Sequence, residues 1–163
     1  MAVDMFIKIG DINGESIDKD AAHKDSIDVL AWSWGLSQSG SFHQGSGGGA
    51  GKVSVQDISI TKYVDSSTTA LILAACKGTA YDKAVLTVRK AGDKPLEYIK
   101  ITLENVLVSS LSTGGSGGED RLTENVTLNF AKFVFKYQEQ DSKGAKKGGT
   151  KDYSFDIAAN VAA

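Results

Sequence analysis

Proline and cysteine are nearly absent from this chain, whose 163 residues include one of each. Because Cys76 is the only cysteine, neither an intramolecular disulfide nor a thiolate zinc cluster can form. This cysteine ends the apolar run 70–76, which predicts a buried and unreactive thiol. The single proline excludes a proline-rich linker protein, and an apolar share of 41% is too high for a disordered chain.

The chain also lacks an excess of basic residues. Its 18 lysines and arginines face 20 acids, for a net charge of -2, which argues against nucleic-acid binding. No apolar run approaches the roughly 20 residues that a transmembrane helix needs, so we expect no membrane insertion. The first residues show no secretory signal. We therefore expect synthesis in the cytoplasm and, if the protein leaves the cell, export by a machine that needs no signal peptide.

Charge is unevenly distributed along the sequence. Residues 1–28 carry three lysines and seven acids, whereas residues 132–151 carry six lysines and two acids. Two solvated segments of opposite sign explain this distribution. Alternatively, one end of a subunit attracts the opposite end of a neighbour, as head-to-tail assemblies require. The sequence leaves both interpretations open.

The dominant pattern is alternation of apolar and polar residues with a period of two, which is typical of β-strands. It runs through residues 3–9, 27–34, 52–63, 84–90, 96–108, 122–137 and 153–157. The segment 27–34 is apolar on both faces, which favours one central strand. The apolar phase flips within 52–63 and again within 122–137, which indicates bulges or bends.

Helix signals occur in one place, where capping residues at 65–69 precede an apolar run and Gly78 follows it. We predict one domain over residues 1–163 that is mostly β. The expected fold is an antiparallel β-barrel or orthogonal sandwich with one short flanking α-helix at about 67–77.

Glycine is enriched, with 18 residues where average usage would give about 11. Six lie at 40–51, four at 114–118 and three at 144–149, each cluster between alternating segments, which predicts loops. The stretch 45–52 looks like a phosphate-binding loop, but Ser46 and Val53 depart from the motif and a strand follows it. Nucleotide binding is therefore rejected.

No group of residues forms a catalytic constellation. The only histidines, His23 and His43, lie in polar stretches and are predicted to be solvated. Trp32 and Trp34 share one face and are predicted to pack in the core or at a subunit seam. The acids near the 114–118 loop are predicted to be solvated or ion-paired at strand ends: Glu104, Glu119, Asp120 and Glu124. We expect no enzyme, cofactor or metal site, and catalysis by Glu124 or His43 is the alternative.

Five stretches are specific enough to compare with a known family. They are MAVDMFIKIGD at 1–11, IDVLAWSWG at 27–35, VQD at 55–57, TKY at 61–63 and VSSLSTGGSGGEDRLTENV at 108–126. Together they resemble Hcp, the haemolysin-coregulated tube protein family of bacterial type VI secretion. The resemblance spans most of the chain and thins out after Tyr137.

The resemblance implies a phage tail tube-like fold that assembles as a homohexameric ring. Such rings stack into a tube that is propelled by a contractile sheath on its baseplate and tipped by a VgrG-like spike trimer. Effector proteins travel in the lumen, so the implied role is a secreted structural subunit and effector chaperone in virulence. A phage-type tail tube protein without effector carriage is the alternative.

The resemblance also maps two candidate sites onto the glycine clusters. Residues 38–52 correspond to the loop that reaches the neighbouring ring, and the ring-stacking candidates are Phe42, Gln44, Ser46, Gly48 and Lys52. The small residues at 113–118 correspond to a lumen-side position, and the effector-facing candidates are Thr113, Ser116 and Gly117.

Overall fold

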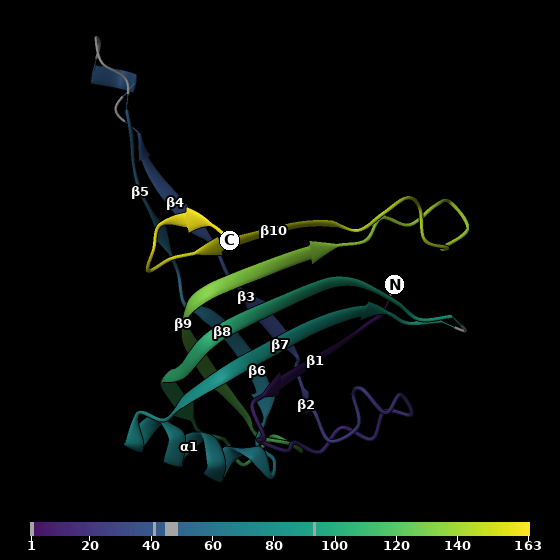
Figure 1. The fold of residues 1–163 in the computed structure, drawn as a ribbon. Helices are drawn as coiled ribbons and strands as arrows, with labels where there is room; N and C mark the ends of the chain where they lie inside the picture. The colour runs from purple at the N-terminus through teal and green to yellow at the C-terminus, as the bar shows by residue number, and fades with distance from the viewer. Residues whose placement is uncertain (1, 41, 45–48, 93) are drawn as a thin grey trace.

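Antiparallel strands dominate the structure, as the alternating sequence predicts. The computed structural model describes residues 2–40, 42–44, 49–92 and 94–163. Within these ranges, strands curl around a hydrophobic core and one α-helix lies across one end (Figure 1). The elements are β1 (Val3–Ile9), β2 (Ile27–Asp28), β3 (Ala31–Ser33), β4 (Leu36–Gly40), η1 (Phe42–Gln44), β5 (Ala50–Val55), β6 (Ile58–Tyr63), α1 (Ser67–Lys77), β7 (Ala80–Lys90), β8 (Leu96–Thr113), β9 (Thr123–Tyr137), β10 (Lys151–Asp156) and β11 (Val161–Ala162).

The main sheet curls because its long strands pair with different neighbours along their lengths. β9 pairs with β6 through residues 123–128 and with β10 through residues 132–137, while β8 runs beside both halves. Buried side chains on β9 change phase between Phe130 and Phe133, which confirms the flip predicted within 122–137. On β8, a bulge between Val108 and Ser110 accommodates the bend.

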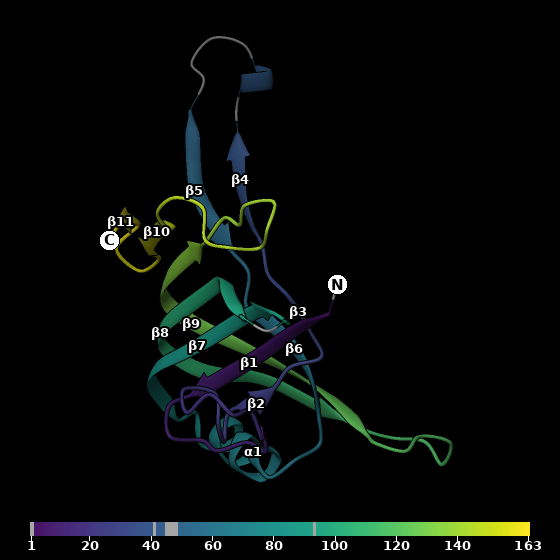
Figure 2. The ribbon, with the colours of Figure 1, turned by 90° about the vertical axis from the view of Figure 1, so that its right-hand side faces the viewer.

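The segment 27–33 closes the sheet into a barrel by connecting its two edges (Figure 2). Residues 27–28 pair with β1 and residues 31–33 pair with β6. Between them, the Val29 N–H donates to Met5 and the Leu30 N–H donates to Thr61, at 2.9 and 2.8 Å. The prediction of one central strand over 27–34 is therefore wrong, because the segment changes partner halfway and forms two short strands.

Apolar side chains from β1, β6, β7, β8 and β9 fill the barrel. The large ones with no exposed surface include Ile7, Ile9, Ile58, Ile60, Leu86, Ile101, Leu103 and Leu128. Pro95 directly precedes β8, so its missing N–H interrupts no strand pairing.

The helix α1 begins and ends where the sequence predicts, and Gly78 terminates it in the left-handed region with φ 62°. Its buried residues are Ser67, Thr68, Leu71 and Ala74, which share one helix face. Cys76 lies off that face and is exposed, so the prediction of a buried thiol is wrong. Among the described residues, no helix combines the length and apolar character needed to span a membrane.

The glycine clusters differ in structure. The cluster at 114–118 lies in the turn between β8 and β9, and the cluster at 144–149 lies between β9 and β10. The cluster at 40–51 joins β4 and β5, which pair as an antiparallel hairpin with η1 between them. Gly40 and Gly51 belong to these strands rather than to a loop, and Gly45, Gly47 and Gly48 lie outside the described residues. The predicted flip within 52–63 is the break between β5 and β6, which belong to different sheets.

Candidate functional site

The β4–β5 hairpin, here called the arm, projects away from the barrel (Figure 2). Its base is anchored by two hydrogen bonds across the strands. The Gln56 N–H donates to the Gly35 carbonyl at 3.0 Å, and the Trp34 Nε1–H donates to the Gln56 carbonyl at 2.9 Å. Beyond this base, all five residues of β4 are exposed.

An aromatic cluster ties the arm's base to the barrel. The Trp34 ring meets Phe133 edge-on at 4.8 Å between centroids and lies 6.4 Å from the rings of Phe130 and Phe135. Trp32 is half-buried and packs against the main core. The two tryptophans are thus packing residues, as predicted.

Three of the five predicted stacking residues are described, and they lie on the arm. Phe42 is in η1 at its far end and is 77% exposed, while Lys52 is an exposed residue of β5. Gln44 is the last residue of η1. Ser46 and Gly48 lie outside the described residues.

The predicted lumen residues lie on a second projecting hairpin, here called the β8–β9 turn. Thr113 is the last residue of β8, and Ser116 and Gly117 follow in the turn, all three exposed. The Glu119 N–H donates to the Ser116 carbonyl at 3.3 Å. The structure thus brings these three residues together on one exposed turn.

Packing at the base orients the β8–β9 turn. A Cβ at Gly115 would lie 2.3 Å from the Leu122 Cδ2, so glycine allows the two sides of the turn to approach closely. The Arg121 guanidinium lies over the Tyr63 ring, 3.7 Å from its centroid, which joins the turn to β6.

Below this turn, a buried polar network connects α1 to the barrel. Glu124 on β9 pairs with Lys62 on β6, and both side chains are fully buried. Lys62 also contacts Asp65 at 3.1 Å, and the Thr68 hydroxyl donates to Glu124 at 2.7 Å. The prediction that Glu124 is ion-paired is confirmed, but the alternative of a solvated carboxylate is wrong.

His23 is buried rather than solvated, which corrects the prediction. The loop 10–26 folds over the outer face of β1 and stacks the imidazole on the Phe6 ring at 4.6 Å. The His23 Nε2 lies 2.7 Å from the Glu97 Oε1 on β8. His43, by contrast, is exposed on η1, as predicted.

Arg89 is a buried residue that the sequence analysis missed. It contacts Asp18 at 2.5 Å and Asp4 at 3.2 Å. The hydrogen bond from Arg89 lowers the pKa of Asp18, and its bond to Asp18 raises the pKa of Arg89. The available signal was the alternation of β7, in which Arg89 follows Val85 and Thr87 at a spacing of two and therefore shares their face.

The charge asymmetry along the sequence is partly neutralised inside the subunit. Arg89 binds two acids of the acidic N-terminal segment, and Lys132 and Lys147 of the basic segment lie 3.6 and 3.2 Å from Glu104 and Glu139. Of the two interpretations of this asymmetry, attraction between opposite ends of neighbouring subunits therefore depends on the charges that are not paired within the subunit.

The fold defines the class of this protein as a small antiparallel β-barrel with a flanking helix and projecting hairpins. The family model described as "Type VI secretion system effector, Hcp" matches residues 6–137. Protein hcp1 of Pseudomonas aeruginosa is 63% identical over 164 residues, which cover 100% of each chain. The chain belongs to the Hcp family of type VI secretion proteins.

Solved structures agree with this assignment. Hcp1 from Salmonella typhimurium superposes with a TM-score of 0.82 at 36% identity, covering 100% of both chains. A structure described as a type six secretion system protein has a TM-score of 0.91 at 29% identity, covering 99% of this chain and 100% of the other. The predicted family and mostly-β fold are both confirmed.

Proposed function

We propose that this chain is the repeating subunit of a type VI secretion inner tube. Six copies form a ring, rings stack into a tube, and effector proteins are carried in the lumen when the tube is exported without a signal peptide. The observation that carries the proposal is the arm, which projects from the barrel of a protein that belongs to the Hcp family. The spike trimer, contractile sheath and baseplate are the partners outside the tube.

The arm has the properties expected of a ring-to-ring contact. A hairpin of two strands is at best marginally stable by itself in water. Here β4 and β5 pair with each other and with no third strand among the described residues. Phe42 at its end and Leu36 near its base, which is 51% exposed, offer apolar surface for a neighbouring ring to cover.

The lateral contacts of the ring need a different surface. On β9 and β10, Phe133, Phe135, Tyr137 and Tyr153 lie on one face, because Tyr153 is the cross-strand partner of Phe135. Phe133 is buried beneath Trp34, but Tyr137 and Tyr153 are 40% and 56% exposed. This aromatic face extends past the subunit's own core, so we assign it to the seam between adjacent subunits.

The β8–β9 turn suits the wall of a lumen. The three candidates are small residues that leave room for a cargo protein to pass: Thr113, Ser116 and Gly117. The hydroxyl groups of Thr113 and Ser116 can each donate and accept hydrogen bonds, so they can contact many partners without carrying a charge. We assign these three residues to the effector-facing surface. Their exposure in the single subunit leaves them accessible to cargo.

The ring is tested by native mass spectrometry and negative-stain electron microscopy of the purified full-length chain. A mass of six subunits and a particle with an open centre are expected. A strictly monomeric protein at micromolar concentration contradicts the proposal. Effectors that co-purify from secreting cells separate a secretion tube from a phage-type tail tube, which carries none.

A further inference from the structure

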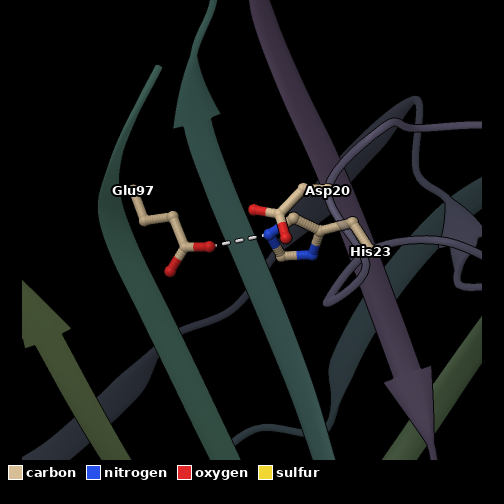
Figure 3. Close-up of side chains that lie close together, drawn as sticks. All are labelled: Asp20, His23 and Glu97. Carbon is tan, nitrogen blue, oxygen red and sulfur yellow. Dashed lines mark hydrogen bonds and ion pairs between the residues drawn. The ribbon is translucent and has the colours of Figure 1, made fainter. Parts of the chain in front are cut away.

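We infer that Asp20, His23 and Glu97 form a binding site for a divalent transition-metal ion, for which Zn²⁺ is the probe. Each residue offers one ligand atom, and the three atoms lie within 4.8 Å of one another. Asp20 and His23 come from the loop before β2, and Glu97 comes from β8 (Figure 3). The site uses none of the residues assigned to ring stacking, the seam or the lumen, so it stands apart from the proposed function.

The imidazole is held in position for coordination. His23 is 6% exposed and stacked on Phe6, so its ring has little rotational freedom. Its Nε2 points toward the Glu97 carboxylate (Figure 3). The His23 backbone N–H donates to the Asp20 carbonyl at 2.9 Å, and this tight turn brings an Asp20 carboxylate oxygen within 4.8 Å of the imidazole ligand atom.

Both carboxylates can adjust to an ion, because Asp20 is exposed and the Glu97 side chain is 39% exposed. An ion between the His23 Nε2 and the Glu97 Oε1 would replace the proton that now joins them. With metal–ligand bonds of about 2.0–2.2 Å in tetrahedral geometry, the two atoms would separate to about 3.4 Å. They are 2.7 Å apart, so a rotamer adjustment of the exposed Glu97 suffices.

The donor set selects the kind of ion. One imidazole nitrogen with two carboxylates suits Zn²⁺ and its transition-metal neighbours, whereas Ca²⁺ and Mg²⁺ prefer oxygen donors alone. Two nearby cations are already engaged elsewhere. Lys8 donates to the Ile12 carbonyl at 2.8 Å, and Arg89 binds Asp4 and Asp18. Lys100 lines the cavity beside His23 and Glu97, where its positive charge would oppose a bound cation.

Binding would connect two distant parts of the chain. Asp20 and His23 belong to the loop 10–26, and Glu97 follows His23 by 74 residues. An ion held by all three would fasten this loop to β8 and stabilise the folded state by mass action. Binding should therefore raise the melting temperature as the Zn²⁺ concentration rises.

The test is isothermal titration of chelator-treated, full-length protein with ZnCl₂ at neutral pH. One ion per chain is expected, and His23→Gln, Asp20→Asn and Glu97→Gln should each weaken binding at least about tenfold. His43→Gln is the matched control, because His43 is the only other histidine and is exposed on η1. That variant should bind Zn²⁺ as the unchanged protein does.

A second measurement uses the unchanged protein, so its result does not depend on whether a variant folds. Nuclear magnetic resonance of ¹⁵N-histidine-labelled protein contains signals from only two imidazoles. Zn²⁺ should shift the Nε2 signal of His23 and leave that of His43 unchanged. Unshifted His23 signals at millimolar Zn²⁺, or equal Zn²⁺ affinity in Glu97→Gln and the unchanged protein, would overturn the assignment.

Discussion

Lys62 and Glu124 face each other across β6 and β9 and form an ion pair with both side chains fully buried. Thr68, near the start of α1, donates to the same carboxylate at 2.7 Å. The pair therefore joins the helix to the barrel at the root of the β8–β9 turn. Both charges are removed from water, so each one needs the attraction of the other to offset the free-energy cost of its burial.

Replacing Glu124 with Ala should destabilise the subunit by about 3 kcal/mol, the low end for a broken buried ion pair, since Lys62 then keeps only Asp65, at 3.1 Å, as a counter-charge. The double variant Lys62→Met with Glu124→Leu should recover most of that loss. Urea denaturation at one fixed protein concentration measures both. A double variant as unstable as Glu124→Ala would contradict this account of the pair.

The hydrogen bond between Asp18 and Arg89 should make the free energy of unfolding depend on pH. Its pKa is lowered from 3.8 by the hydrogen bond from Arg89, so its contribution is present above pH 3.8 and is lost as the pH falls through the lowered pKa. Asp18→Asn should therefore be less stable than the unchanged protein at pH 7. In urea titrations, the difference should shrink as the pH falls below 3.8.

Asp28 is a control for the Asp18 prediction, because its pKa is shifted in the opposite direction. Partial removal from water raises the pKa of Asp28 above 3.8 although the residue is exposed, so ionised Asp28 weakly opposes folding and this effect is lost as the pH falls through the raised pKa. Asp28→Asn should be as stable as the unchanged protein at pH 7, or more stable. The same titrations would refute this prediction if Asp28→Asn lost stability at pH 7.

Gly14→Ala should destabilise the loop that carries His23. An added Cβ would lie 2.5 Å from the Ser26 carbonyl oxygen and 2.7 Å from the Ile27 Cα, and neither backbone atom can rotate away. We expect a loss of about 1–3 kcal/mol in the free energy of unfolding, measured by urea denaturation. Gly117→Ala, where nothing lies within 4 Å of the added Cβ, should be nearly neutral.

Phe42→Ser should weaken ring stacking and leave the ring intact. Burial of one aromatic side chain contributes about 1.5–3 kcal/mol, so each arm contact should weaken tenfold or more. Tube length by electron microscopy and ring mass by native mass spectrometry separate the two effects. His43→Ser is the matched control on the same exposed 3-10 helix, η1. Tubes of normal length with Phe42→Ser would remove the arm from the stacking contact.

Ser116→Trp should reduce effector retention while rings still form, because a bulky ring would project from the exposed β8–β9 turn into the lumen. Pull-down of effectors with purified rings measures retention. Ser142→Trp, on the exposed loop between β9 and β10, is the control that adds the same surface elsewhere. Equal retention by the two variants would refute the lumen assignment.

Several parts of the fold were predictable because their signals are local. Period-two alternation predicts strands wherever one face is apolar, and the α1 boundaries follow from residues at the helix's own ends. The split of 27–34 into two strands was not predictable, because it depends on Met5 and Thr61 accepting hydrogen bonds from opposite sides.

The candidate site residues also divide into those that the sequence predicts and those that only the tertiary structure brings together. The resemblance assigns Phe42 to a loop that reaches the neighbouring ring and Ser116 to a lumen-side segment, and both residues are exposed in the structure. The burial of His23 beside Glu97 escaped prediction, because these residues are 74 apart and meet only when the loop 10–26 folds over β1. Likewise, nothing within α1 alone reveals which of its faces meets the barrel and leaves Cys76 exposed.

By itself, the sequence determined the strand content, the ends of the helix and the resemblance to the Hcp family. Only the tertiary structure decided which charged residues are buried. The physical reason is that alternation and capping depend on neighbouring residues, whereas the pairing of Lys62 with Glu124, 62 residues apart, depends on the register between two strands. Register is a property of the folded barrel, because it is set by all the strands that pack together.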